Sequence, residues 1–193
     1  GYELVMAPYA IAHMKIGLKL YETGYRFESD ERARIYLANT LEPAKEFSGT
    51  FDFAIPALSH EAKAVNQVKW DQRFTVVIGN PPYNVSSQNK NESITALMES
   101  YKSSVRDERN IQPLQDDYIK FFRCSQALID RSGIGIIGLV SNSAFMSGLI
   151  FRGMRESLKN SFTDMSFVNL NGNAMLTRTT DDGIKDENIF NIS

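Results

Sequence analysis

Apolar residues follow two alternating patterns along the chain. In some segments they recur at helical spacing, and in others they form short continuous runs. Helical spacing is typical of amphipathic helices, and it predicts helices over residues 5–22, 94–105, 116–132 and 148–160. Short apolar runs are typical of strands, and they predict strands over residues 34–38, 74–79, 134–140 and 165–170, of which 74–79 and 134–140 are expected to be buried.

This alternation of helices and strands predicts an α/β fold with a mostly parallel sheet and crossover helices. Residues 42–73 show no clear strand pattern, although Ser59 is placed to cap a short helix that turns Ala62, Val65 and Val68 inward. The polar stretch 84–92 is expected to be mobile.

The composition is that of an ordinary globular domain. The chain has 193 residues, of which 42% are hydrophobic and 23% charged, which is enough for one folded domain. Its net charge of −2 argues against a stand-alone nucleic-acid binder, because such domains usually carry a basic surplus that neutralises phosphates. Any affinity for DNA must therefore come mostly from elsewhere.

Cysteine and histidine usage also narrows the class of protein. Cys124 is the single cysteine and cannot form an internal disulfide. The sequence has neither a signal peptide nor a long apolar run, which predicts a cytoplasmic protein without a membrane segment. His13 and His60 are the two histidines and offer no ligand set, so no metal site is predicted.

The four residues Asn80-Pro81-Pro82-Tyr83 directly follow the apolar run 74–79. They lie where a strand passes into a loop, which is where open α/β sheets place their chemistry. Each proline fixes its own φ angle and holds the preceding residue in extended geometry. Such a stiff turn can aim two acceptors, the Asn80 amide oxygen and the Pro81 carbonyl, and place the Tyr83 ring beside them.

This arrangement suits an exocyclic amine on a flat base. The lone pair of an aromatic amine is delocalised into the ring, which makes the nitrogen a poor nucleophile. Two acceptors that each take one N–H draw the nitrogen toward tetrahedral geometry and stabilise the growing positive charge. Face-on stacking against Tyr83 is worth roughly 1–3 kcal/mol. Stacking would offset much of the few kcal/mol needed to unstack a base from a duplex.

The motif resembles that of the N6-adenine DNA methyltransferases, which reads Asn/Asp-Pro-Pro-Tyr/Phe after an apolar strand. Further segments resemble the methyltransferase module of single-polypeptide, Type I-like (Type ISP) restriction-modification enzymes, namely residues 117–121, 135–138, 141–145, 151–155 and 169–173. The resemblance implies a Rossmann-like methyltransferase fold. It also implies direct methyl transfer from S-adenosylmethionine to the N6 of an adenine flipped out of double-stranded DNA, with Asn80, Pro81, Pro82 and Tyr83 as the catalytic motif.

The resemblance further implies where the cofactor binds. Glu3 corresponds to the ribose-binding carboxylate at the end of the second strand, and Asn39 occupies the place of an Asp that hydrogen-bonds the cofactor adenine in many relatives. An Asn oxygen can accept the same bond. Phe190 resembles a second aromatic that packs against the flipped base, and the alternative is that it begins the core of a further strand.

One part of the family pattern is missing. The glycine-rich cofactor motif, of the form Asp-Pro-x-x-Gly-x-Gly, does not occur in the sequence. Residues 1–193 are therefore interpreted as a partial catalytic domain, inactive in isolation, whose glycine-rich motif lies upstream and whose target-recognition domain lies downstream. Helicase and nuclease modules are further candidates for the same polypeptide.

Several alternatives remain open from the sequence. The motif also occurs in N-methyltransferases that act on protein glutamine or ribosomal RNA guanine, and a truncated fragment could have only a structural role. Residues 133–138 match the G-x-G-x-x-G dinucleotide pattern, but the glycines lie between a helix and a strand, so close packing is the better interpretation. Phe145 is interpreted as core, and the basic stripe Arg152, Arg155 and Lys159 as a solvated face.

Overall fold

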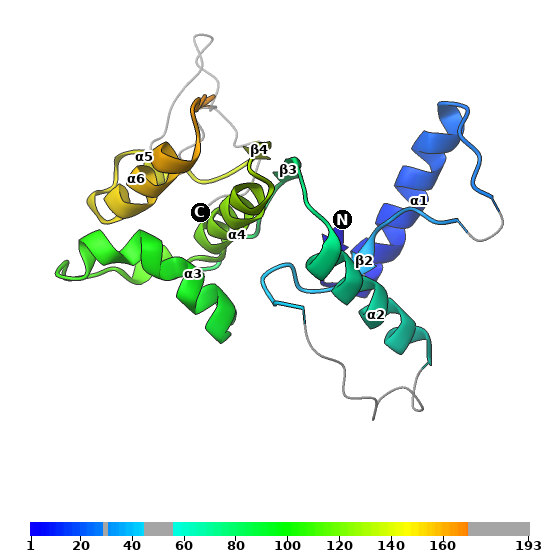
Figure 1. Ribbon diagram of the computed structural model, residues 1–193, viewed down its shortest axis with the longest axis horizontal. Helices are drawn as coiled ribbons and strands as arrows, with labels where there is room; N and C mark the ends of the chain where they lie inside the picture. The colour runs from blue at the N-terminus through cyan, green and yellow to red at the C-terminus, as the bar shows by residue number, and fades with distance from the viewer. Residues whose placement is uncertain (29–30, 45–55, 170–193) are drawn as a thin grey trace, which may run out of the picture. The chain divides into compact units, whose positions relative to one another are not determined.

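A computed structural model describes residues 1–28, 31–44 and 56–169 of the chain (Figure 1). The chain divides into two compact units, Gly1–Gln72 and Arg73–Ser193, which are called here the N-terminal and the C-terminal unit. Among the described residues, each unit contains one pair of parallel strands and the helices that pack on it.

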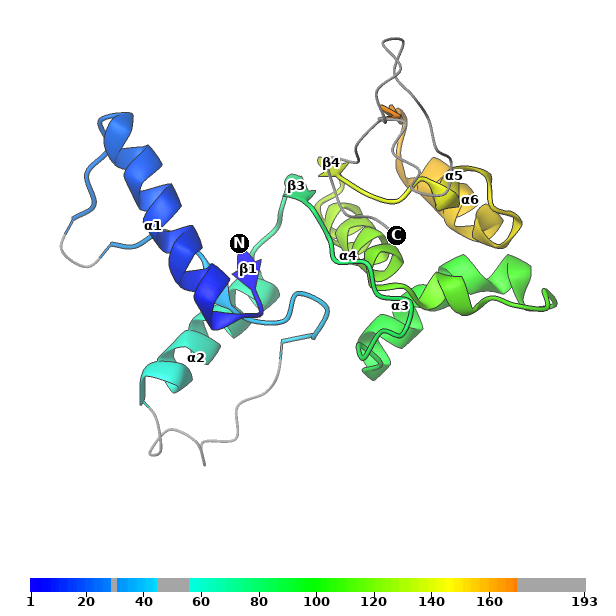
Figure 2. The same cartoon turned by 180° about the vertical axis from the view of Figure 1, so that it is seen from behind.

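The N-terminal unit is a short βαβ element followed by a helix. Its elements are β1 (Tyr2–Glu3), α1 (Met6–Glu22), β2 (Tyr36–Leu37) and α2 (Pro56–Asp71). β1 and β2 are parallel, with Tyr2 opposite Tyr36. In Figures 1 and 2, α1 and α2 lie on either side of this pair. Gly24, with φ of 90°, follows the end of α1.

Helix α2 holds the segment that follows β2. Val65 is buried, and the Lys69 ammonium donates hydrogen bonds to the carbonyls of Asn39 and Glu42, at 2.7 and 2.6 Å. The inward face predicted for this helix is thus confirmed. The predicted start is wrong, because α2 begins at Pro56 and Ser59 lies inside it.

The C-terminal unit is built on β3 and β4. Its helices and strands are β3 (Val76–Gly79), α3 (Glu92–Lys102), α4 (Asp117–Ser132), β4 (Ile136–Leu139), α5 (Ala144–Ser147) and α6 (Arg152–Ser161), with short 3₁₀ turns at Ser103–Val105, Gln112–Gln115 and Leu149–Phe151. β3 and β4 are parallel, with Val76 opposite Ile136 and Gly79 opposite Leu139. Both strands therefore end at the same edge.

The core of the C-terminal unit lies between α3, α4 and α6 (Figure 1). Its fully buried side chains include Ile94, Met98, Val105, Leu114, Ile119 and Met154. The buried hydroxyl of Tyr101 donates to the Gln126 side chain at 2.8 Å. Gly153 permits the close approach of α6 to α3, because a Cβ there would collide with the Tyr101 carbonyl.

The glycines of residues 133–138 have the structural role that the sequence favoured. Gly133 ends α4 in the left-handed region, with φ of 77°. A Cβ on Gly135 would lie 2.5 Å from the Ile129 side chain and 2.6 Å from the Thr75 carbonyl oxygen. Gly138 lies inside β4. The dinucleotide-binding interpretation of this pattern is therefore excluded by its place in the fold.

Two expectations about the sheet are wrong. β3 and β4 are largely exposed rather than buried, with 80% of Ile78 and 68% of Ile136 accessible. Residues 165–169 are not in a strand, and Leu170 lies outside the described residues. The described strands form two parallel pairs, which agrees with the predicted parallel pairing, and the full Rossmann-like sheet that the resemblance implies is not confirmed by the described parts of the chain.

Candidate active site

The Asn80–Tyr83 motif begins at the carboxyl end of β3, as the apolar run before it predicts. The Val140 amide donates to the Gly79 carbonyl at 3.1 Å, so Asn80 follows directly on the last hydrogen bond between the two strands. Pro81 is buried, whereas Asn80 and Pro82 are exposed. The Asn80 side chain makes no hydrogen bond to any residue that the structure describes, which leaves its amide oxygen available as an acceptor.

The Tyr83 ring is fixed by two contacts. It lies against the Tyr118 ring, with centroids 5.6 Å apart and planes inclined at 45°, and its hydroxyl donates to the Val140 carbonyl at 3.2 Å. Burial raises the pKa of Tyr83 above 10, and the negative charge of Asp116 raises it further. The phenol is therefore neutral at physiological pH, and its oriented ring is a platform for stacking.

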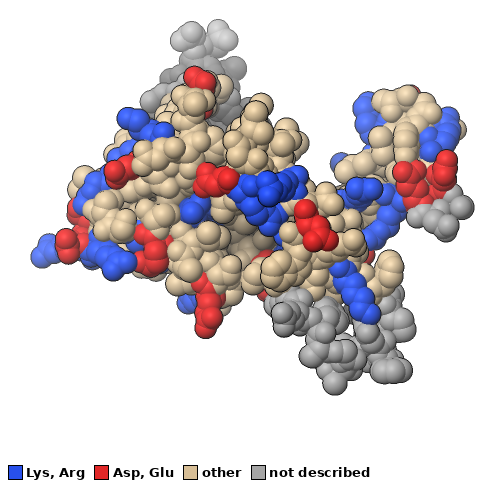
Figure 3. Space-filling view, in the orientation of Figure 1, with Lys and Arg blue, Asp and Glu red and all other residues tan. Residues whose placement is uncertain are grey.

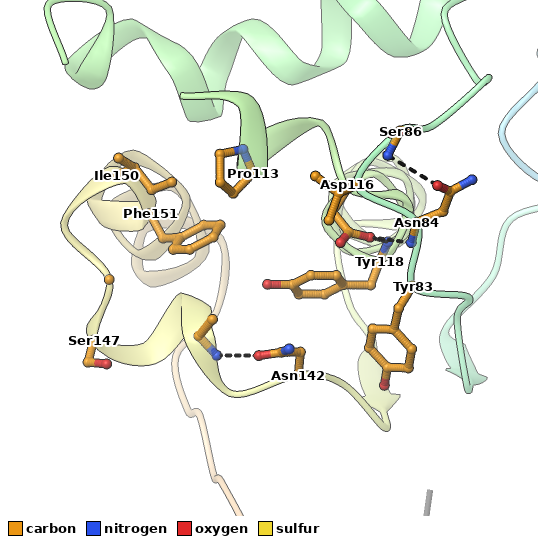
Figure 4. Close-up of a pocket in the computed structure, with 13 residues that line it drawn as sticks. Tyr83, Asn84, Ser86, Pro113, Asp116, Tyr118, Asn142, Ser147, Ile150 and Phe151 are labelled. Atoms are coloured by element: carbon orange, nitrogen blue, oxygen red, sulfur yellow. Dashed lines mark hydrogen bonds between the residues drawn. The ribbon is translucent and has the colours of Figure 1, made fainter. Parts of the chain in front are cut away.

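Tyr83 lines a pocket of about 780 Å³ (Figure 4). The walls come from the segment after the motif, the start of α4, and the region from the end of β4 to the start of α6. The lining residues are Tyr83, Asn84, Val85, Ser86, Pro113, Asp116, Tyr118, Asn142, Ala144, Ser147, Gly148, Ile150 and Phe151. The volume is within the roughly 300–1,000 Å³ typical of small-ligand sites. Asn80 and Pro81 are not among these lining residues.

Two consecutive aspartates at the start of α4 anchor the loop after Tyr83. Asp116 caps the helix and accepts a hydrogen bond from the Asn84 amide at 2.8 Å (Figure 4). Asp117 accepts from the Ser87 hydroxyl at 2.6 Å and from the Asn89 side-chain amide at 2.9 Å. Both aspartates are buried. The sequence predicts a helix that starts at residue 116, but it does not show that these two carboxylates hold the loop.

Lys120 completes the anchor. Its side chain is 2% exposed, and its ammonium donates to the Ser87 hydroxyl oxygen at 2.7 Å and to the Asn89 carbonyl at 2.5 Å. Burial lowers the pKa of Lys120, while the nearby charge of Asp117 opposes this shift. The stretch 84–92, expected to be mobile because it is polar, is therefore tied to α4 by its polar side chains.

Asn142 is a residue of the pocket to which the sequence assigned no role. It follows β4, at the edge where Asn80 follows β3, and its amide oxygen accepts from the Ala144 amide at 2.7 Å (Figure 4). A signal was present in the sequence, since a polar side chain just after a strand next to β3 lies at the same sheet edge.

Glu3 and Asn39, the two residues expected to bind a cofactor, lie at one edge of the β1–β2 pair. Glu3 ends β1, and Asn39 follows β2 by two residues. One Glu3 carboxylate oxygen accepts from the Val5 amide at 2.9 Å, and the Asn39 amide oxygen accepts from Leu41 at 3.0 Å. A carboxylate can accept bonds from two ribose hydroxyls, and an amide oxygen from an adenine amine, so both residue types fit a nucleoside. Phe190 lies outside the described residues.

Residues 7–175 match the family model of the Eco57I restriction-modification methylases. The chain belongs to this family. No curated protein sequence matches the chain.

Solved structures support the same assignment. The chain is similar to DrdV in a cryoEM structure of its DNA complex, with 29% identity, a TM-score of 0.62 and coverage of 83% of this chain. It is also similar to the ATP-dependent Type ISP restriction-modification enzyme LlaBIII bound to DNA, with 27% identity, a TM-score of 0.64 and coverage of 81%. A nuclease-deletion mutant of the Type ISP enzyme LlaGI, with a DNA substrate mimic, shares the fold at 21% identity, a TM-score of 0.61 and coverage of 83%.

These relatives are much longer than the chain. It spans 16% of the DrdV chain, 11% of LlaBIII and 15% of LlaGI. Within the described residues, no helix combines the length and apolar character needed to cross a membrane. The same residues contain no cluster of three or more His, Cys, Asp or Glu side chains placed to hold a metal ion.

Proposed function

We propose that this chain is the catalytic core of an S-adenosylmethionine-dependent methyltransferase that modifies the N6 amine of adenine in DNA. The observation that carries the proposal is the Asn80–Tyr83 motif at the carboxyl end of a parallel strand, with Tyr83 lining an adjacent pocket. Membership of the methylase family supports the reaction class. The residue types of the motif support an aromatic amine as the acceptor.

Each part of the motif has a separate task. A flipped adenine would stack on the Tyr83 ring, which the Tyr118 contact and the Val140 hydrogen bond hold in one orientation. The Asn80 oxygen and the Pro81 carbonyl would each accept one N–H of the exocyclic amine. The amine lone pair would then be free to form the new N–C bond, and the positive charge on nitrogen would be stabilised until a proton leaves to water.

The bound cofactor supplies an electrophilic methyl group. Glu3 would accept hydrogen bonds from the ribose hydroxyls, and Asn39 would accept one from the cofactor adenine. Since the sequence lacks the glycine-rich motif, we propose that residues 1–193 form part of a catalytic domain and that the rest of the cofactor site comes from other segments of a longer polypeptide.

Double-stranded DNA is the proposed substrate. Each of the three similar structures contains DNA or a DNA mimic. The present chain has a net charge of −2, and acidic and basic side chains are interspersed on the face shown in Figure 3. Because phosphate contacts require a basic surface, most of the DNA affinity and the sequence specificity would reside in a target-recognition domain elsewhere in the polypeptide.

The test is single-turnover methylation by the full-length enzyme that contains this chain. With a DNA duplex that carries the recognition site, we expect N6-methyladenine in the nucleoside digest. Asn80→Ala should lower the chemical rate by about 10²–10³, the loss typical of one preorganised electrostatic group, while DNA binding is retained. Asn160→Ala, at an exposed position of α6, is the matched control.

Three outcomes would overturn the proposal. Methyl transfer to RNA or to protein glutamine instead of DNA would favour the other N-methyltransferases that share the motif. An Asn80→Ala enzyme that methylates adenine at the parent rate would exclude the proposed mechanism. Absence of methylation by a full-length enzyme that binds both DNA and S-adenosylmethionine would favour a purely structural role.

A further inference from the structure

Asn142, which follows β4, adds a residue to the proposed site. Val140, two residues before it, donates its amide hydrogen to Gly79 at 3.1 Å and accepts the Tyr83 hydroxyl at 3.2 Å. Asn142 therefore lies at the sheet edge where Asn80 lies, and it lines the same pocket as Tyr83 (Figure 4). The two asparagines follow neighbouring parallel strands and belong to one catalytic edge.

The hydrogen bond to Ala144 fixes the orientation of the Asn142 amide. Its oxygen accepts from the Ala144 amide at 2.7 Å, so its nitrogen, Nδ2, carries two hydrogens that can be donated. Within the described parts of the chain, Nδ2 makes no hydrogen bond. The side chain is only half-buried, so a ligand in the pocket can reach this donor.

A donor at this place complements the acceptors of the motif. In adenine the N6 amine attaches to C6, and the ring nitrogens N1 and N7 lie on its two sides as acceptors. A site with two acceptors for the amine after β3 and one donor after the neighbouring strand β4 therefore suits this edge of adenine. Guanine presents the O6 acceptor where adenine presents N6–H, and a glutamine side chain has no ring nitrogen, so both would leave a polar group of the site without a partner.

We propose that Asn142 is a specificity-determining residue that donates a hydrogen bond from Nδ2 to a ring nitrogen, N1 or N7, beside the N6 amine of the flipped adenine. This inference rests on the proposed function, because it requires adenine in the pocket. It assigns Asn142 to recognition of the base and Asn80 to stabilisation of the reacting nitrogen.

The decisive experiment combines variants with base analogues in the full-length enzyme. The target adenine is replaced by 1-deazaadenine or by 7-deazaadenine, each of which lacks one of the two acceptors. The enzymes are the parent, Asn142→Asp, Asn142→Ala and the control Asn160→Asp. Asn142→Asp keeps the size of the side chain and its acceptor for Ala144 but removes the donor. If the role of Asn142 is purely structural, Asn142→Asp should therefore keep the parent activity and Asn142→Ala should lose activity.

We expect both Asn142 variants to lose about tenfold to a hundredfold in single-turnover kcat/KM on adenine, since an unmatched polar group in a base pocket costs that much. The parent enzyme should lose a similar factor on one of the two analogues. On that same analogue the Asn142 variants should have the same kcat/KM as the parent enzyme. The identity of the analogue would reveal which nitrogen accepts the bond. Asn160→Asp should behave as the parent.

Other outcomes would overturn the inference. Asn142→Asp with parent activity would show that the side chain acts only through Ala144. If the loss caused by the variant and the loss caused by the analogue multiply when the two are combined, Asn142 and the ring nitrogens do not interact. If the parent requires Asn80 but neither deaza analogue affects it, the inference fails and the proposed function stands. If the parent does not methylate adenine, both fail.

Discussion

Replacement of Lys120 by Met tests whether the anchor at the start of α4 holds the loop after the Asn80–Tyr83 motif. Lys120 is 2% exposed and donates to Ser87 and Asn89, at 2.7 and 2.5 Å. Hydrogen bonds from a charged donor contribute about 1.5–3 kcal/mol each. Met carries no charge, so the variant no longer has the desolvation cost of a buried ammonium, and this gain offsets part of the loss. We therefore expect a net local destabilisation of about 2–4 kcal/mol.

Hydrogen–deuterium exchange of the full-length enzyme measures this effect where it occurs. Amides of residues 84–91 that exchange by local opening should exchange about thirtyfold to a thousandfold faster in Lys120→Met, which is the rate equivalent of that free energy. Lys159→Met, at an exposed position in the last turn of α6, should leave them unchanged.

A second variant separates the anchor from a general loss of stability. Asp117→Leu removes the acceptor for Ser87 and for the Asn89 side chain. Lys120 and Asp117 share these two partners. The double variant should therefore lower the free energy of local opening by clearly less than the sum of the two single variants. Unchanged protection of residues 84–91 in Lys120→Met, or simple additivity with Asp117→Leu, would refute the anchoring role.

Three further predictions concern the pocket and the cofactor. Tyr83→Ala should weaken the complex with an extrahelical base by roughly 1–3 kcal/mol, and Tyr83→Phe should have a mild effect because the ring is retained; 2-aminopurine fluorescence at the target position reads out both. Burial, followed by the charge of Asp116, raises the pKa of Tyr118 above its ordinary value of 10, so the folded state retains a proton that the unfolded state loses. The free energy of unfolding should therefore fall as the pH rises above 10, and Tyr118→Phe should reduce this slope in chemical denaturation. In calorimetric titration, the isolated 193-residue chain should bind S-adenosylmethionine weakly or not at all, and micromolar affinity would show that the cofactor site is misplaced.

The helices, and the strand β3 that precedes the Asn80–Tyr83 motif, were predictable because their signals are local. The periodic apolar residues of α3 and α4 determine which face is buried, and the short apolar run before Asn80 identifies β3. The prolines then fix the backbone after the strand, whatever packs around it. Phe145 was likewise predicted as core, and it is 3% exposed.

The errors arose where a segment depends on distant partners. Polar composition suggested mobility for residues 84–92, but Ser87 and Asn89 are fixed by Asp117 and Lys120, about 30 positions further along the chain. No local pattern carries that information. Continuous apolar runs suggested buried strands, yet Ile78 and Ile136 are exposed, because an apolar run reports the tendency to be buried and not the partner that covers it.

The pocket joins three segments whose positions follow from one geometric fact. Parallel strands place their carboxyl ends together, so the segments after β3 and β4 meet at one edge and supply Tyr83 and Asn142. Helix α4 precedes β4 in the crossover and brings its start, with Asp116 and Tyr118, to the same edge. The proline turn fixes the backbone of the motif, whereas the orientation of its ring depends on the other two segments. Changes at the start of α4 are therefore expected to alter the proposed methyl transfer through the orientation of the Tyr83 ring.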